Sequence, residues 1–412
     1  MRSILYLIFS VFISAGSGFL VQLYLAKKLS VYDYGVYTSI INLVNLIAPI
    51  VAFGIASFLL RAYSEEGNHA SRWMKNVIQT LILTTTLAFM ILQSWSYYKN
   101  GFEFYFIVYC LFFIYMVSIS YNSFTTLKYQ LEENYKLLSL WQLAPKLLML
   151  ISLVLVLTIK KPSIYNVAMG YGISGILVII MSVKSLKQMT KAELKLKTPD
   201  GFILTNDHIN IFGLLKNSYP YGLSGLFYLI YYQSDILILS YYLDYIEVGY
   251  YGFSLVFVTA VCLIPSVYYL TFRLKKIHAL AAIDRTALKN TYKLHIKYSL
   301  IIGVSFFFIF VICIKPFITI VFDDKYEPAL YIIYSLAAYI PIKFLTLNSD
   351  SIMHTKGLVE IKVRIMGIAA LLNVLINFIT IPSLGAMGAV TATIMTELFL
   401  LLAFHITLSR KL

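Results

Sequence analysis

Twelve long apolar stretches run through the chain, and they restrict its fold more than any other feature of the sequence. A helix needs about 20 consecutive apolar residues to cross the hydrocarbon core of a bilayer, where every backbone polar group must be satisfied within the helix. The pattern therefore predicts an all-α integral membrane protein with about twelve transmembrane helices. The predicted spans are residues 4–25, 38–60, 77–97, 104–124, 143–159, 164–183, 218–240, 248–272, 298–322, 328–349, 365–381 and 386–408.

Basic residues are distributed unevenly between the two sides of the predicted membrane. The two chain ends and the gaps after even-numbered spans hold 24 of the 33 lysines and arginines, whereas the gaps after odd-numbered spans hold 6. Cytoplasmic loops of membrane proteins carry an excess of these residues. Both chain ends are therefore predicted to lie in the cytoplasm.

The net charge of +14 follows from the same distribution. Basic residues in cytoplasmic loops face anionic lipid head groups, where each gains about 1 kcal/mol. We therefore expect membrane lipids as partners and no nucleic acid. The six histidines show no metal-binding spacing, and no catalytic arrangement or paired carboxylates occur in the sequence. The sequence thus predicts neither an enzyme nor a cofactor or metal site.

The longest polar stretch, residues 184–217, separates two sets of six spans and carries six lysines. We predict an N-terminal six-helix bundle at residues 1–183, a basic cytoplasmic linker at 184–217 and a C-terminal six-helix bundle at 218–412. Because six is even, both halves enter the membrane in the same orientation, related by an axis along the membrane normal. Two parallel bundles around a cavity are expected of an alternating-access transporter.

A short internal repeat supports this division. Leu29-x-x-x-Asp33-Tyr34-Gly35-Val36-Tyr37 follows the first span and lines up with Leu243-x-x-x-Glu247-Val248-Gly249-Tyr250-Tyr251 after the seventh. We expect the acidic residue at the N-terminus of the next helix, where the helix dipole favours it, and the glycine in a tight turn leading into that helix.

Charged residues inside apolar spans are candidates for function, because each costs about 2.5 to 3.5 kcal/mol at a helix centre on insertion scales. Asp235 and Glu397 are candidates for coupling to a proton or sodium ion, or for balancing a lysine; a structural hydrogen bond or ion pair is the alternative for Glu397. Lys146, Lys315 and Lys343 also fall within spans. Snorkelling to the head groups is the alternative to a role inside the protein for these lysines.

Amide side chains within the spans can line a cavity or join neighbouring helices through hydrogen bonds. We favour joining for any single one of them. They are Gln22, Asn42, Asn45, Gln233, Asn373 and Asn377.

The chain resembles the Wzx-type polysaccharide flippases over essentially its whole length. The resemblance rests on the two six-span halves, on the acid-x-Gly-x-Tyr pattern in both repeats and on two further motifs. These motifs are Asp235-Ile-Leu-Ile-Leu239 in the seventh span and Asn373-x-x-x-Asn377-x-x-x-Ile381-Pro382-x-x-Gly385-Ala386-x-Gly388-Ala389 between the last two spans.

The resemblance implies the multidrug/oligosaccharidyl-lipid/polysaccharide (MOP) exporter superfamily and a MATE-like, V-shaped pair of six-helix bundles with a parallel pseudo-twofold repeat. It implies that undecaprenyl-diphosphate-linked oligosaccharide, an O-antigen or related repeat unit, moves from the cytoplasmic to the periplasmic leaflet of a bacterial inner membrane by alternating access. A polysaccharide polymerase and a chain-length regulator are implied as further partners.

Cationic side chains in the cavity of such flippases are expected to meet the diphosphate. In this chain the expectation falls on two lysines within spans and on three arginines at the inner edges of spans, with two amides of the second span as further candidates for substrate binding. These residues are Lys146, Lys343, Arg61, Arg273, Arg364, Asn42 and Asn45.

Two other functions stay open. A cation-coupled multidrug extruder of the same superfamily would share the twelve spans, but its usual cationic substrates call for interior acids, and three lysines within the spans stand against Asp235 and Glu397. A membrane O-antigen polymerase or glycosyltransferase would need a sizeable outer loop for its chemistry, and every predicted outer gap is short.

Overall fold

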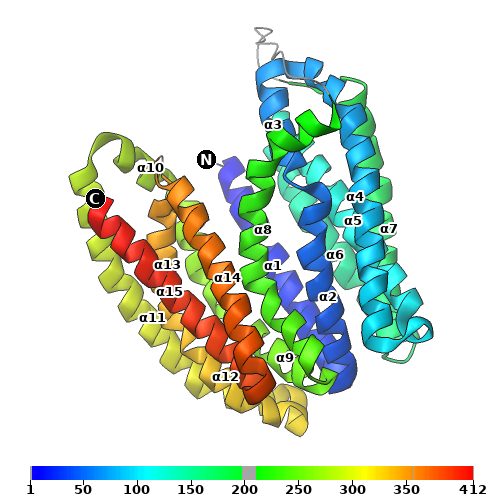
Figure 1. Cartoon of the computed structure of the whole chain (residues 1–412), viewed down its shortest axis with the longest axis vertical. Coiled ribbons are helices and arrows are strands. Elements are labelled where there is room, and N and C mark those ends of the chain that lie inside the picture. The colour runs from blue at the N-terminus through cyan, green and yellow to red at the C-terminus, as the bar shows by residue number, and fades with distance from the viewer. Residues whose placement is uncertain (1, 197–209, 356, 412) are drawn as a thin grey trace. The chain divides into compact units, whose positions relative to one another are not determined.

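The computed structural model describes residues 2–196, 210–355 and 357–411, which form α-helices and three short 3-10 or π-helical segments, without any β-strand (Figure 1). The chain packs as two compact units. Unit 1 comprises Met1–Tyr24 and Ile40–Leu226, and unit 2 comprises Leu25–Ser39 and Phe227–Leu412. The described parts of the predicted linker, residues 184–196 and 210–217, belong to unit 1, and residues 197–209 lie outside the described part of the chain.

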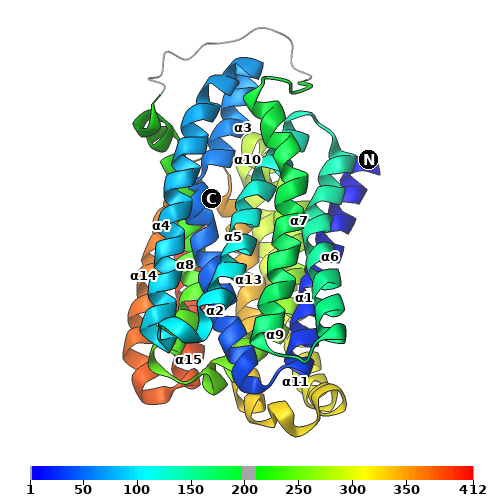
Figure 2. The same cartoon turned by 90° about the vertical axis from the view of Figure 1, so that its right-hand side faces the viewer.

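Unit 1 is built around four long helices, α4 to α7, each of which contains one predicted span. Helix α5 lies between α4 and α7, and α6 packs against both α5 and α7 (Figure 2). The helices with residues in unit 1 are α1 (Arg2–Lys28), α2 (Val31–Ala52), α3 (Ile55–Glu66), a 3-10 segment (Gly67–Trp73), α4 (Met74–Asn100), α5 (Phe102–Leu131), α6 (Tyr135–Ile159), α7 (Ile164–Thr190) and α8 (Ile211–Tyr242).

The second predicted span, residues 38–60, is not a single helix. Helix α2 ends at Ala52 and α3 begins at Ile55, because Phe53 and Gly54 between them have positive φ angles of 28° and 71°. Pro49 lies one turn before the break and removes a backbone donor from α2. The apolar pattern marks the span but carries no signal for this change in backbone conformation.

Unit 2 contains the later spans. Helix α13 packs against α11 and α15, and α14 packs against α15. The tenth predicted span is divided between α12 and α13 at Ala338. Unit 2 contains the end of α1, the start of α2, the second part of α8, then α9 (Tyr245–Val267), a π-helical segment (Tyr268–Phe272), α10 (Leu274–Ile283), α11 (Arg285–Phe322), a 3-10 segment (Asp323–Ala329), α12 (Leu330–Ala337), α13 (Tyr339–Met353), α14 (Val359–Leu384) and α15 (Ala386–Lys411).

The two copies of the repeated motif pack against each other within unit 2. A Cβ atom at Gly35 of α2 would overlap the backbone of Tyr245, and one at Gly249 of α9 would lie 2.5 Å from the backbone oxygen of Val31. Both glycines lie in regular helix without a positive φ angle. The expected tight turn is therefore wrong: these glycines are needed because a side chain would not fit where the two helices cross.

The helices are long and apolar enough for a membrane protein. Among the described residues, eight helical stretches meet the length and composition of a membrane span. Two of these, Val31–Lys99 and Arg285–Met353, extend over 69 residues, about 100 Å at 1.5 Å per residue, and therefore hold more than one crossing. Helices α1 and α8 contain two further predicted spans. The predicted all-α, multi-pass membrane fold is confirmed.

Candidate functional site

A cavity of about 420 Å³ lies within unit 2, between α8, α9, α13, α14 and α15. Aromatic and apolar side chains form most of its wall, including Tyr231, Tyr232 and Phe404. Basic and acidic side chains of α13, of α14 and of the residue that follows α13 line it as well. They are Lys343, Asp350, His354 and Lys362.

Lys343 and Glu397 form an ion pair in the wall of this cavity. The Nζ atom of Lys343 lies 3.2 Å from Oε2 of Glu397, and the hydroxyl of Tyr231 donates a hydrogen bond to the same oxygen. The other carboxylate oxygen of Glu397 accepts no hydrogen bond from the described residues. Because Glu397 is fully buried while the Lys343 side chain is 16% exposed, the pair presents its ammonium group to the cavity.

Two tyrosine rings also stabilise the charge of Lys343. Its Nζ atom lies 5.8 Å from the ring centre of Tyr231 and 5.6 Å from that of Tyr339. A cation over an aromatic face gains about 0.5 to 2 kcal/mol, depending on how far it is desolvated. The ammonium group is therefore stabilised by the rings in addition to its carboxylate partner.

A second charged group lines the same cavity. Lys362 Nζ lies 2.6 Å from Asp350 Oδ1 and 2.7 Å from His354 Nε2. Nε2 of His354 also lies 3.7 Å from Oδ2 of Asp350. The described lining thus holds two lysines, one carboxylate and one histidine.

The other predicted residues of unit 2 lie elsewhere. The guanidinium of Arg273 is buried, donates to Oδ1 of Asn348 at 2.7 Å and lies 5.3 Å from the ring centre of Tyr269. Arg364 is exposed on α14, two residues after Lys362. Neither arginine belongs to the lining of the cavity.

Asp235 is held in a separate buried network. Its Oδ1 accepts from Asn377 at 2.6 Å, and its Oδ2 accepts from the hydroxyls of Tyr251 at 2.9 Å and Thr393 at 2.5 Å. Asn377 also donates to the side-chain oxygen of Asn373 at 3.1 Å. The network links α8, α9, α14 and α15, and it contains residues from each of the motifs that carried the family resemblance. Joining of helices, the interpretation favoured for the amides, agrees with this geometry.

The predicted site residues of unit 1 come from three helices, α2, α3 and α6. Arg61 is exposed and pairs with Glu65 one turn later, at 2.8 Å. Asn42 and Asn45 of α2 and Lys146 of α6 are partly buried. None of the four lines the cavity in unit 2.

Lys343 was predicted as a site residue, whereas the other acidic and basic side chains of the lining were not. Asp350, His354 and Lys362 follow the predicted end of the tenth span and were assigned to the gap after it. In the structure α13 continues to Met353, so Asp350 lies in its last turn and His354 directly follows it. The spacing of four residues between them was the signal in the sequence, since it places both on one helix face.

The family of the chain follows from a sequence comparison. A family profile described as polysaccharide biosynthesis protein matches residues 1–272. The chain belongs to the polysaccharide biosynthesis protein family. No curated protein sequence matches it.

The chain shares its fold with solved structures of membrane transporters, among them the following two. The structure titled lipid II flippase MurJ, inward closed conformation, matches with a TM-score of 0.70 at 17% identity, over 97% of this chain and 87% of that chain. An inward-facing multidrug resistance MATE family transporter of the MOP superfamily matches with a TM-score of 0.64 at 13% identity, over 97% and 95%. The predicted MATE-like fold is confirmed, and these two structures are titled as a flippase and a transporter.

Proposed function

We propose that this protein is a flippase for undecaprenyl-diphosphate-linked oligosaccharide, an O-antigen or related polysaccharide repeat unit. It would carry this lipid from the cytoplasmic to the periplasmic leaflet of a bacterial inner membrane, with both chain ends in the cytoplasm. Membership of the polysaccharide biosynthesis family supports the substrate class. The observation that carries the proposal is that Lys343 and Lys362 present two ammonium groups to one cavity inside an apolar bundle.

A charged cavity suits the diphosphate for a simple physical reason. An ion moved bare into a medium of low dielectric constant loses on the order of 20 kcal/mol in the Born limit. Only the head group needs a polar path, because the polyprenyl tail can stay in the lipid. A membrane potential that is negative inside also favours outward movement of an anion, by about 2.3 kcal/mol per charge per 100 mV.

The two ion pairs give the cavity a way to bind and release an anion. An incoming diphosphate competes with Glu397 for Lys343 and with Asp350 for Lys362, and the pairs form again when it leaves. Glu397 is the proposed coupling residue, because one of its oxygens is free to take a proton when Lys343 engages the substrate. Asp235 already accepts three hydrogen bonds, and its proposed role is structural.

A multidrug extruder is the second candidate, because transporters of that kind share the fold. A cationic substrate would need an accessible carboxylate. Glu397 is fully buried behind Lys343, and Asp235 is 4% exposed and hydrogen bonded on both oxygens. Asp350 is the one carboxylate among the described residues of the cavity lining, where it pairs with Lys362 at 2.6 Å and stands against two lysines. The arrangement therefore favours an anionic substrate.

Deletion of the gene tests the proposal. Surface display of a polysaccharide should stop, and its lipid-linked unit should accumulate on the cytoplasmic leaflet until the gene is restored on a plasmid. A polymerase and a chain-length regulator would act on the unit after its transfer. Normal surface glycan together with increased sensitivity to cationic dyes would instead support the extruder.

A further inference from the structure

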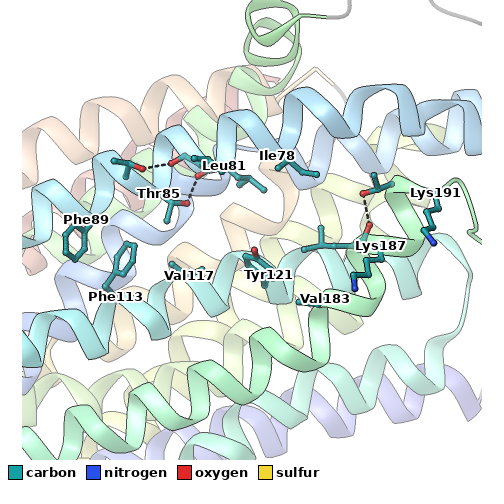
Figure 3. Close-up of a pocket in the computed structure, with 14 residues that line it drawn as sticks. Ile78, Leu81, Thr85, Phe89, Phe113, Val117, Tyr121, Val183, Lys187 and Lys191 are labelled. Carbon is teal, nitrogen blue, oxygen red and sulfur yellow. Dashed lines mark hydrogen bonds between the residues drawn. The ribbon is translucent and has the colours of Figure 1, made fainter.

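A groove of about 780 Å³ runs along unit 1 between α4 and α7, with α5 as its floor (Figure 3). Its α4 wall extends from Ile78 to Phe89, and Phe113 and Tyr121 lie on its floor. Lys191 lies at the end nearest Ile78. None of these residues belongs to the cavity in unit 2.

Helix packing explains why the groove exists. Helix α7 approaches α5 closely at Gly175, where a Cβ atom would lie 2.9 Å from the Cα atom of Tyr115. Helix α4 packs mainly on α5 and much less on α7. A furrow is therefore left between α4 and α7.

The groove is apolar although three threonines line it. Thr85, Thr86 and Thr190 each donate their hydroxyl to the backbone oxygen four residues earlier in their own helix. Because their hydroxyl groups are already hydrogen bonded, these threonines offer only their methyl groups to a molecule in the groove. Such a wall suits a hydrocarbon chain better than a sugar, which would need hydrogen-bond partners.

The length of the groove matches one leaflet of a bilayer. Ile78 and Phe89 lie eleven residues apart in α4, which is about 16 Å at 1.5 Å per residue. One leaflet contributes about 15 Å, half of the hydrocarbon core. The groove therefore extends from its lysine end to roughly the depth at which an acyl chain of that leaflet ends.

Positive charge is concentrated at this end of the groove. Lys187 and Lys191 lie one turn apart on α7, and both are exposed. They also line an adjoining pocket together with Lys184 and Glu193, so three lysines face one carboxylate there. Like charges four residues apart on a helix repel each other, and an anion between them relieves this repulsion.

We propose that the groove binds an acyl chain of an anionic phospholipid, whose phosphate lies between Lys187 and Lys191. The lipid comes from the leaflet at the Lys187 end, which is the cytoplasmic leaflet in the orientation predicted from the sequence. It fills the furrow, neutralises the lysine pair and holds α4 to the rest of unit 1. Its occupancy is independent of the molecule that unit 2 transports.

Lipid retention by the purified full-length protein tests the site. The probes are phosphatidylglycerol and phosphatidylcholine with identical acyl chains, and native mass spectrometry measures the lipid that stays bound. The charge variant is Lys187→Gln with Lys191→Gln, matched by Lys160→Gln with Lys161→Gln, an exposed pair in the loop at the other end of α7. Thr86→Trp fills the groove without changing its charge. Thermal unfolding in lipid-free detergent establishes that each variant is folded.

We expect the wild type and the Lys160/Lys161 variant to retain phosphatidylglycerol in preference to phosphatidylcholine. The Lys187/Lys191 variant should bind it on the order of tenfold more weakly, and Thr86→Trp should lose it at unchanged charge. Equal retention of the two lipids by the wild type, or wild-type retention of phosphatidylglycerol by the Lys187/Lys191 variant or by Thr86→Trp, would overturn the proposal. Displacement of the bound lipid by undecaprenyl diphosphate alone would assign the groove to the transported lipid instead.

Discussion

Lys343 has both a carboxylate and two aromatic rings around its ammonium group, so its charge does not depend on Glu397 alone. This matters for a carrier of anions, because the lysine must stay charged while its partner changes. If a diphosphate takes the place of Glu397, the rings of Tyr231 and Tyr339 remain in contact with the cation. The cavity is therefore suited to exchanging one anion for another.

Single substitutions test whether transport depends on the charge of Lys343. Lys343→Ala should abolish transport at normal protein level, whereas Lys343→Arg should keep part of it because the positive charge remains. Lys315→Ala is the matched control, since Lys315 is an exposed lysine within a span of α11 and should be dispensable. Glu397→Gln keeps the shape but loses the charge, so transport should become slower and less dependent on pH. Surface polysaccharide in the complemented deletion strain, with immunoblots for protein level, measures all four.

Wild-type transport by both Lys343→Ala and Glu397→Gln would show that this pair is structural. The search for the substrate contacts would then move to the arginines and to the amides of α2. The residues to be tested next are Arg61, Arg273, Asn42 and Asn45.

The sequence identified Lys343 and Glu397 as charges within apolar spans but did not show that they meet. Lys343 and Glu397 were identifiable because a charge in an apolar span is rare. Their pairing was not predicted, since they are 54 residues apart and the sequence does not say which helices pack together. Asp350, His354 and Lys362 were missed because the apolar pattern ends before α13 does and begins after the start of α14.

The positions of the helices agree closely with the apolar pattern of the sequence. The contacts between the helices could not be predicted from that pattern. Each predicted span lies within a helix or a pair of helices, but the break at Phe53 and Gly54 and the role of the repeated glycines required the structure. The repeated motif was visible as a match in sequence, whereas the contact between its two copies depends on tertiary packing. Lys325 adds to this contact region by donating to the backbone oxygens of Ala26 and Leu29 at the end of α1.

The crossing of α2 and α9 leads to a prediction about elements. Gly249→Ala should destabilise the protein by about 1 to 3 kcal/mol, because the added methyl group forces the two backbones apart. Gly16→Ala is the matched control: it is also a glycine within a helix, but no atom lies within 4 Å of its Cβ position. Both substitutions raise helix propensity equally. Thermal unfolding of the purified proteins measures the difference, and similar midpoints for the two variants would contradict the close crossing.

At the level of the whole molecule, the family match and the fold match cover different lengths of the chain. The family profile matches residues 1–272, whereas Lys343, Asp350, Lys362 and Glu397 all lie beyond that match. The fold comparison covers 97% of the chain. The family therefore indicates the class of pathway, and the cavity of unit 2 supplies the argument for an anionic lipid-linked substrate.

Movement of that substrate between leaflets in proteoliposomes is the most direct measurement of the proposed function. Lipid-linked oligosaccharide is placed in both leaflets of vesicles that contain the purified protein. An impermeant lectin added outside the vesicles measures the fraction of the oligosaccharide that it can reach. We predict that nearly all of it becomes accessible with the wild type, while Lys343→Ala leaves accessibility at the level of protein-free vesicles. Wild-type accessibility no higher than in protein-free vesicles, together with transport of a cationic dye by the same preparation, would contradict a flippase.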